Sequence, residues 1–231
     1  MALLNFKNIS KAYATQTGSI TVLDNVSFEV APGEFVSLVG KSGAGKTTLL
    51  RLAMAELKPT KGRIFLDGKD VHKLKPHDLC LLRRRVGMVF QDFKLLNDRT
   101  AFENVAFAME VAGYPDKKIL EDVPEVLKLV GLSEKTNNFP AQMSAGEKQR
   151  VAIARALIQR PDVIFADEPT GNLDPINAWD IVKLLVKINE LGTAVVLATH
   201  VKEIINTIGK RVISLERGRV IRDEENGKYL I

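Results

Sequence analysis

Short apolar runs along the first third of the chain predict β-strands. These runs are rich in β-branched and aromatic residues and cover residues 3–9, 20–30, 35–39, 62–66 and 86–90. A glycine-rich stretch follows the third run, and residues 47–57 then predict a helix that stops near Pro59. The pattern therefore opens as a β-rich region with one early helix.

The middle of the chain changes to helical spacing between residues 101 and 130. Its apolar positions recur every three or four residues in two series: Val105, Met109, Ala112, and then Val123, Val126, Leu127, Val130. Pro115 and Pro124 punctuate the segment. We therefore predict an insert of a few short helices here.

Helices and strands alternate in the last third. The predicted helices are residues 146–159, 176–190 and 201–208, and the predicted strands are residues 163–166, 194–198, 212–215 and 219–221. Strands that alternate with helices of ten to fifteen residues are typical of βαβ units, which build a parallel sheet covered on both faces. The fold class is therefore α/β.

A phosphate-binding motif occupies the turn between the third strand and the first helix. It consists of Gly40, Lys41, Ser42, Gly43, Ala44, Gly45, Lys46 and Thr47, which match G-x-x-x-x-G-K-[ST]. Glycines let backbone N–H groups turn toward phosphate oxygens, and the helix N-terminus adds its positive dipole. Lys46 supplies a charge for the β- and γ-phosphates, and Thr47 offers a hydroxyl to Mg²⁺. The motif predicts a nucleoside triphosphate site.

The phosphate motif alone does not select one enzyme class, because kinases, GTPases, helicases and transport ATPases share it. The sequence contains no Asn-Lys-x-Asp guanine reader, which argues against a G protein. A small-molecule kinase stays open at this point.

Two acids, Asp167 and Glu168, follow the apolar strand 163–166. The carboxyl ends of strands in α/β sheets are where ligands bind. Asp167 suits Mg²⁺, directly or through water, and Glu168 suits the polarisation of an attacking water. A helix cap and its neighbour would be the structural alternative.

One helix upstream of the acids stands the run Met143, Ser144, Ala145, Gly146, Glu147. This run resembles the signature motif of the ATP-binding-cassette (ABC) ATPases, usually Leu-Ser-Gly-Gly-Gln. The helix that begins here would direct the Ser144 hydroxyl and the Gly146 backbone at a γ-phosphate. The spacing of Ser144 and Glu147 also fits a capping box, and both interpretations can hold together.

Further ABC elements stand in the family's order. They are an adenine-stacking aromatic at Tyr13, the glutamine loop at Gln91, the D-loop at Asn172, Leu173 and Asp174, and the switch histidine at His200. The resemblance implies Glu168, His200 and Gln91 as catalytic residues, with Thr47, Gln91 and Asp167 at the metal. It implies ATP contacts from Tyr13 and from the phosphate loop through Thr48, with ATP and Mg²⁺ as cofactors. Taken singly, Tyr13 fits core packing, Gln91 a loop amide and His200 a helix cap.

The signature departs from the family pattern at three positions. Met143 is a mild apolar exchange for leucine. Ala145 replaces the first glycine, and its methyl group is a candidate for crowding the phosphate or for demanding a φ that alanine disfavours. Glu147 replaces the usual glutamine. Because Ser144 and Gly146 remain, we expect ATP binding to survive.

The resemblance covers the whole chain and implies one ABC ATPase domain over residues 1–231. Such a domain has a mainly parallel sheet core, an N-terminal antiparallel β subdomain and a helical subdomain, here at approximately residues 92–150. In this family the signature of one subunit completes the site of the other. The resemblance therefore implies a head-to-tail homodimer with two ATP.

Residues 90–100 and 103–106, around and after Gln91, are most similar to the cell-division branch of the family. This branch implies an integral-membrane, permease-like partner of the FtsX type and regulation of peptidoglycan hydrolases, and no nucleic acid is expected. Residues 169–174 are shared with lipoprotein-releasing and macrolide-export ATPases, so an export subunit is the alternative. A soluble ABC ATPase of translation or DNA repair and a P-loop kinase are the other rivals.

Composition indicates where in the cell the protein is expected to work. The longest apolar runs are 5 residues, against roughly 20 for a spanning helix. No secretory signal is expected, and the single cysteine, Cys80, favours a reducing cytosol and a buried role for its thiol. A pI near 9.2 is compatible with nucleotides, nucleic acid or an anionic membrane surface and selects none of them. The run Arg83-Arg84-Arg85 fits a solvated basic face, with contact to anionic lipid or to acids of a partner as the alternative. The expected location is cytoplasmic, peripheral on the inner face of the membrane.

Overall fold

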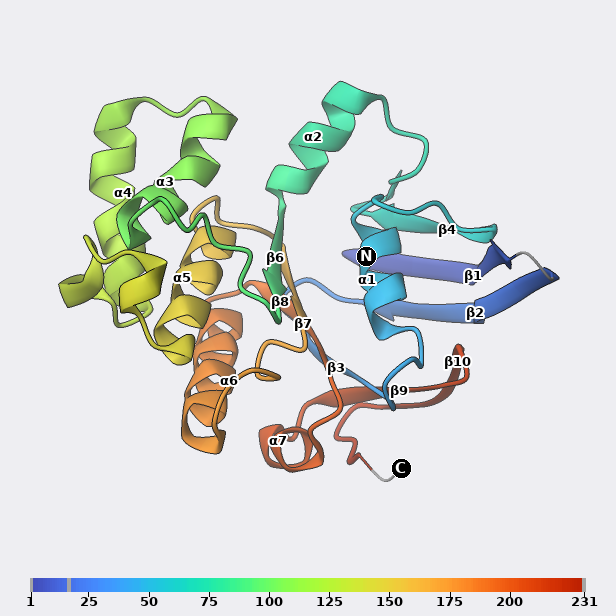
Figure 1. The fold of residues 1–231 in the computed structure, drawn as a ribbon. Helices are drawn as coiled ribbons and strands as arrows, with labels where there is room; N and C mark the ends of the chain where they lie inside the picture. Colours follow the sequence, from blue (N-terminus) through green and yellow to red (C-terminus); the bar gives the residue numbers. More distant parts are fainter. Residues whose placement is uncertain (1, 16–17, 230–231) are drawn as a thin grey trace. The chain divides into compact units, whose positions relative to one another are not determined.

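A computed structural model describes residues 2–15 and 18–229 of the chain (Figure 1). Its internal contacts gather into two units. The first unit comprises Met1–Arg83 with Ala194–Ile231, and the second comprises Arg84–Thr193. Each unit is described by itself.

An antiparallel sheet forms the N-terminal part of the first unit. Its order is β2-β1-β4-β5, with β1 at Leu4–Thr15, β2 at Gly18–Val30, β4 at Lys61–Leu66 and β5 at Lys69–Asp70. Phe6 of β1 lies opposite Phe28 of β2, and their rings stack with centroids 4.4 Å apart. Aromatic pairs across strands stabilise antiparallel sheets. The predicted antiparallel β subdomain is confirmed.

The first unit also holds the parallel strands that carry the phosphate loop. Strands run side by side in the order β10-β9-β3-β8, with β3 at Phe35–Val39, β8 at Ala194–Thr199, β9 at Arg211–Glu216 and β10 at Arg219–Glu224. β3 pairs in parallel with both β8 and β9. Every residue of β3 and β8 is buried, which explains why their sequences are almost entirely apolar.

Helices of the first unit differ from the sequence prediction in two places. Helix α1 spans Lys46–Ala53 and ends before the predicted residue 57, because Ala55 adopts a left-handed φ of 52°. Helix α2, Pro76–Arg84, was not predicted; it buries only Leu82, so its apolar signal is weak. Helix α7 spans Lys202–Ile208.

Two predictions about the surface around α2 are wrong. Cys80 is exposed rather than buried. Arg83 donates to the carbonyls of Met54 and Ala55 at 3.1 and 3.2 Å. The expected solvated basic face is therefore not formed by the whole arginine run.

The second unit pairs two parallel strands with four helices. Its strands are β6 at Val86–Phe90 and β7 at Val163–Asp167, and its helices are α3 at Ala101–Ala112, α4 at Asp116–Leu129, α5 at Ala145–Leu157 and α6 at Pro175–Glu190. Single 3-10 turns cover Ser133–Lys135 and Pro140–Gln142. Arg85, from the arginine run, bonds Asp162 at 2.6 Å next to these strands.

The two prolines of the helical insert behave differently. Pro115 is the N-cap residue of α4 and therefore marks the boundary before this helix, as the sequence predicts. Pro124 lies inside α4 and does not end it, contrary to the sequence prediction. A proline inside a helix leaves the carbonyl four residues earlier without its usual partner. That carbonyl belongs to Leu120, whose residue is 65% exposed, so water is available to it.

Candidate functional site

The phosphate loop runs from the end of β3 to the start of α1. Gly43 and Gly45 have φ of 80° and 105°, which side-chain-bearing residues rarely adopt. A Cβ on Gly45 would lie 2.6 Å from a methyl carbon of Leu23, so this turn also needs glycine for space. The Lys46 ammonium donates to the carbonyl of Gly40 at 2.7 Å and lies within 3.4 Å of that of Lys41. The loop thus closes around a buried cation.

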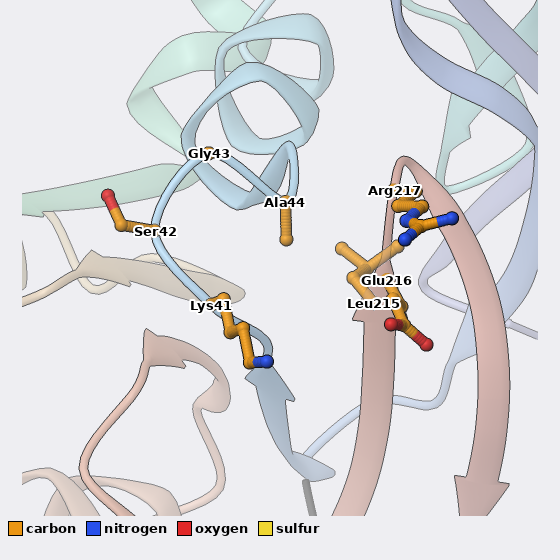
Figure 2. Close-up of a pocket in the computed structure, with 7 residues that line it drawn as sticks. All are labelled: Lys41, Ser42, Gly43, Ala44, Leu215, Glu216 and Arg217. Carbon is orange, nitrogen blue, oxygen red and sulfur yellow. The ribbon is translucent and has the colours of Figure 1, made fainter.

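A pocket of about 280 Å³ lies beside the loop (Figure 2). Its walls are the loop residues Lys41, Ser42, Gly43 and Ala44, the last two residues of β9, Leu215 and Glu216, and the turn residue Arg217. A Cβ on Gly40 would lie 2.4 Å from the Leu215 carbonyl oxygen, so the loop rests directly on β9. The strand next to β3 therefore supports the back of the loop.

Tyr13 stands near the end of β1 and is 37% exposed, which rules out the core-packing alternative. The Lys11 ammonium lies 4.9 Å from the centroid of its ring and donates to the Lys58 carbonyl at 2.8 Å. A cation over a ring face is attracted by the ring's quadrupole. An accessible aromatic with a fixed neighbour suits the stacking of a base.

His200 directly follows β8 and is exposed. It does not cap the next helix: the N-cap residue of α7 is Val201, whose N–H donates to Thr199 Oγ1 at 3.2 Å. The structural alternative for His200 is therefore not observed. Its position at the carboxyl end of a parallel strand fits a ligand-facing residue.

The two acids end the buried strand β7 in the second unit. Asp167 is the last strand residue and is buried, while Glu168 takes a left-handed φ of 47°. Such a φ costs a non-glycine residue roughly 1–2 kcal/mol. The Glu168 carbonyl accepts from the Gly171 N–H at 3.1 Å, which fixes the turn. The backbone therefore turns sharply immediately after the strand.

Gln91 and the D-loop are joined by two hydrogen bonds. The Gln91 amide donates to Asn172 Oδ1 at 3.2 Å, and the Asn172 amide donates to the Gln91 carbonyl at 2.9 Å. A Cβ on Gly171 would lie 2.8 Å from the Gln91 amide nitrogen. Glycine at this position lets the two loops approach, so Gln91 is more than a solvated loop amide.

The signature residues form the N-terminus of α5. Ser144 is the N-cap residue: its hydroxyl accepts from the Glu147 N–H at 3.2 Å, and Glu147 accepts from the Ser144 N–H at 2.8 Å. The capping box is therefore present. Hydrogen bonding from the Ser144 backbone lowers the pKa of Glu147, and the Lys135 charge adds to this. Ala145 is helical, so the concern about its φ was wrong.

Asp174 caps α6 at the end of the D-loop. Its carboxylate accepts from the backbone N–H groups of Ile176 and Asn177 at 3.1 and 3.0 Å. Hydrogen bonds from Asn177, side chain first and backbone second, lower the pKa of Asp174. The carboxylate is thereby held ionised at the helix N-terminus. Leu173 donates its N–H to the Thr170 carbonyl and completes the turn.

Sequence reasoning missed two residues that tie α5 to the segment around Gln91. Gln149 is fully buried and donates to the Phe90 carbonyl at 3.3 Å. Arg155 donates to the carbonyls of Phe93 and Lys94 at 2.9 and 2.7 Å, and burial lowers the pKa of its guanidinium. No local sequence signal marks either residue, because both bond carbonyls about sixty positions away in the chain.

The predicted site residues thus fall into two sets. The phosphate loop, Tyr13 and His200 belong to the first unit, whereas the acids, Gln91, the signature and the D-loop belong to the second. Within the second unit the structure brings Gln91 to the D-loop and the D-loop helix to the signature helix. Among the described residues, no helix combines the length and apolar character needed to cross a membrane.

Comparison with known proteins agrees with this arrangement. The cell division ATP-binding protein FtsE of Bacillus subtilis is 50% identical over 227 residues, covering 98% of each chain. FtsE of Streptococcus pneumoniae is 49% identical over 229 residues, covering 99% of this chain and 98% of that protein.

A solved dimeric structure of the bacterial ABC transporter cassette MJ0796 is also similar. It superposes with a TM-score of 0.88 at 37% identity, covering 98% of this chain and 100% of that one. Residues 23–171 match the family described as ABC transporter. This match spans more than half of the chain and includes the phosphate loop, the signature and the acids. The chain therefore belongs to the ABC transporter family.

Proposed function

We propose that this chain is the ATP-hydrolysing subunit of a cell-division complex, in which ATP binding and hydrolysis drive an integral-membrane partner of the FtsX type. The observation that carries this proposal is the near full-length similarity to FtsE proteins, at 50% identity over 98% of each chain. That similarity favours the cell-division role over the alternative of a lipoprotein-releasing or macrolide-export subunit. Family membership also argues against a P-loop kinase.

The residues of the first unit fit a magnesium nucleotide. The loop closes around the Lys46 ammonium, whose charge suits the β- and γ-phosphates, and nothing lies within 4 Å of where a Cβ on Gly43 would stand. Phosphate oxygens can therefore approach the loop backbone closely. In this proposal Thr47 of the first unit offers its hydroxyl to Mg²⁺, and the family pattern assigns Gln91 and Asp167 of the second unit to the same ion. The ion would supply charge neutralisation for the β- and γ-oxygens.

Each remaining site residue has a proposed role in hydrolysis. Glu168 accepts the proton of the attacking water, which typically contributes 10²–10⁴-fold to the rate. His200 holds the γ-phosphate, and Gln91 links the metal to the membrane partner. The ring of Tyr13 stacks on adenine, and its 37% exposure supports this role.

A homodimer completes the site. In this proposal Ser144, Ala145, Gly146 and Glu147 of one subunit contact the ATP of the other, and Asn172, Leu173 and Asp174 lie at the same interface. The capped N-terminus of α5 supports the role, since its backbone N–H groups and dipole favour an anion. The dimeric structure of the similar cassette MJ0796 supports the assembly.

The subunit would work in the cytoplasm, peripheral on the inner face of the membrane and without nucleic acid. The membrane partner would dock at the segment that follows Gln91. Arg155 supports this segment by bonding two of its carbonyls.

The replacement Glu168→Gln tests the chemistry. We expect ATP binding to persist, hydrolysis to fall by about 10²–10⁴-fold, and the ATP-bound dimer to accumulate. Turnover would be measured as phosphate release and assembly by light scattering after gel filtration. Unchanged turnover would remove Glu168 from the catalytic role.

Purification from native membranes with ATP bound tests the partner. We expect an FtsX-like membrane protein to be recovered with this chain. Recovery of an export permease without such a protein would overturn the cell-division role in favour of the export alternative.

A further inference from the structure

Three segments with separate proposed roles are connected in a ring within the second unit. Gln149 on the signature helix α5 donates to the Phe90 carbonyl, which directly precedes Gln91. Gln91 in turn exchanges two hydrogen bonds with Asn172 of the D-loop. The third connection, from the D-loop back to the signature helix, passes through one side chain, Asn177.

Asn177 lies in the first turn of α6, just after the D-loop. Its side-chain amide donates to Asp174 Oδ2 at 2.5 Å, while its backbone N–H donates to Asp174 Oδ1 at 3.0 Å. Both oxygens of the D-loop carboxylate are thus engaged by one residue. Hydrogen bonds to a charged acceptor are the stronger kind, so the Asn177 side chain is held in one orientation.

The same side chain presses against the signature motif. A Cβ placed on Gly146 would lie 2.6 Å from Asn177 Oδ1 and 3.0 Å from its amide carbon. Gly146 is buried on α5, and glycine at this position lets the amide approach the helix backbone. The D-loop carboxylate and the signature glycine therefore lie on opposite sides of the Asn177 amide.

We propose that Asn177 is a positioning residue that holds the N-terminus of the signature helix in register with the D-loop, so that both motifs reach the partner subunit together. The inference rests on the proposed function, because it concerns the ATP-bound dimer. Asn177 does not touch nucleotide in this role. It acts through Asp174 on one side and through Gly146 on the other.

The chemistry of the contact explains why an amide suits this position. The donor half bonds the Asp174 carboxylate, and the oxygen half packs on Gly146. An aspartate has nearly the same shape but donates no proton, and its charge would repel that of Asp174 at this short range. The exchange Asn177→Asp therefore removes the link without opening a cavity.

The test uses the full chain in the Glu168→Gln background, where ATP should trap the dimer. Two quantities are measured: the dimer dissociation constant with Mg²⁺ and ATP, by sedimentation velocity, and the ATP affinity of the dilute protein, by fluorescence titration. We expect Asn177→Asp to weaken dimerisation at least about tenfold, a typical cost for a lost hydrogen bond to a charged group. The ATP affinity of the dilute protein should stay within about twofold of the parent, a difference below 0.5 kcal/mol.

Two further variants separate positioning from folding. The double exchange Asp174→Asn with Asn177→Asp reverses donor and acceptor, keeps a favourable N-cap residue and should restore most of the dimerisation. Asn189→Leu removes another amide from the same helix, one that donates to the Thr193 carbonyl at 2.9 Å far from the D-loop. This control should lower thermal stability without a selective loss of dimerisation.

The outcomes distinguish the two proposals. If the Glu168→Gln parent does not dimerise with ATP, the proposed function fails and the role of Asn177 fails with it. If the parent dimerises and Asn177→Asp dimerises as tightly, only the positioning role is overturned. A proportional loss of ATP affinity and dimerisation in Asn177→Asp, without rescue by the double exchange, would also overturn it.

Discussion

The carboxylate of Glu147 stands where related signatures have glutamine, and its replacement by glutamine can be predicted quantitatively. The Glu147 carboxylate accepts from the Ser144 N–H at 2.8 Å and lies 3.6 Å from the Lys135 ammonium. Glutamine can keep the first bond, because its amide oxygen also completes a capping box. What Glu147→Gln removes is the negative charge.

The negative charge of Glu147 contributes to the free energy of unfolding through two interactions. A carboxylate at a helix N-terminus is worth about 0.3–1 kcal/mol. The ion pair with Lys135 adds about 0.2–1 kcal/mol after solvent screening, because both side chains are partly exposed, Glu147 to 28% and Lys135 to 42%. The free energy of unfolding should therefore fall by about 0.5–2 kcal/mol at neutral pH. For a chain of this size that lowers Tm by about 1–8 °C.

The difference should depend on pH in a defined direction. The pKa of Glu147 in the folded protein lies below its ordinary value of 4.5, mainly because the Ser144 backbone bonds the ionised form. The stabilisation is then complete above the unfolded-state pKa and is lost as the pH falls through the folded-state pKa. Wild type and Glu147→Gln should differ most above pH 6, and the difference should begin to shrink near the unfolded-state pKa of about 4.5 and narrow further as the pH falls below it.

Scanning calorimetry of both proteins between pH 7.5 and 4 measures the difference in Tm at each pH. Equal Tm values at pH 7, or a gap that stays constant down to pH 4, would refute the reasoning. The matched control is Glu103→Gln, in the capping box that Glu103 forms with Thr100 at the start of α3. Hydrogen bonds from Thr100 lower the pKa of Glu103 as well. This control should reproduce the pH trend without changing ATP-dependent dimerisation.

Three further outcomes follow from the geometry. Gly218→Ala should lower Tm by about 4 °C or more, because φ is +76° and the new Cβ would lie 2.2 Å from the Val22 carbonyl oxygen. The control Gly192→Ala has φ +103° but nothing within 4 Å of the new Cβ, so calorimetry should show a clearly smaller fall in Tm. Lys46→Ala should weaken ATP binding about 10–100-fold in a titration, and undiminished affinity would contradict its phosphate role. A thiol reagent should modify Cys80 in the native protein with one equivalent, because that side chain is exposed; modification only after unfolding would contradict the structure.

Features set by neighbours in sequence were predictable. The apolar runs of β3 and β7, the glycine loop and the spacing of Ser144 and Glu147 all depend on groups within a few residues of one another. Local hydrogen bonds and side-chain alternation can therefore be predicted from the sequence. The existence of most helices and strands, and the family, followed from them.

Errors arose where burial decided the outcome. Helix α2 has a single buried residue, Leu82, so its apolar periodicity was too faint to predict. Residue type alone predicts a buried thiol for Cys80, although the residue is exposed. Pro124 predicts a boundary between short helices, but the solvent-exposed turn before it tolerates the lost bond and α4 continues through it.

The sequence by itself determined most of the strands, the capping box of Ser144 and Glu147, and the inventory of phosphate, acid and signature motifs. Only the tertiary structure decided which motifs contact one another. Gln91 and Asn172 are separated by 81 positions and yet exchange two hydrogen bonds, and Asn177 meets Gly146 from another helix. Such contacts depend on how packed helices and strands bring distant backbone together, and no local pattern of apolar and polar residues records that geometry.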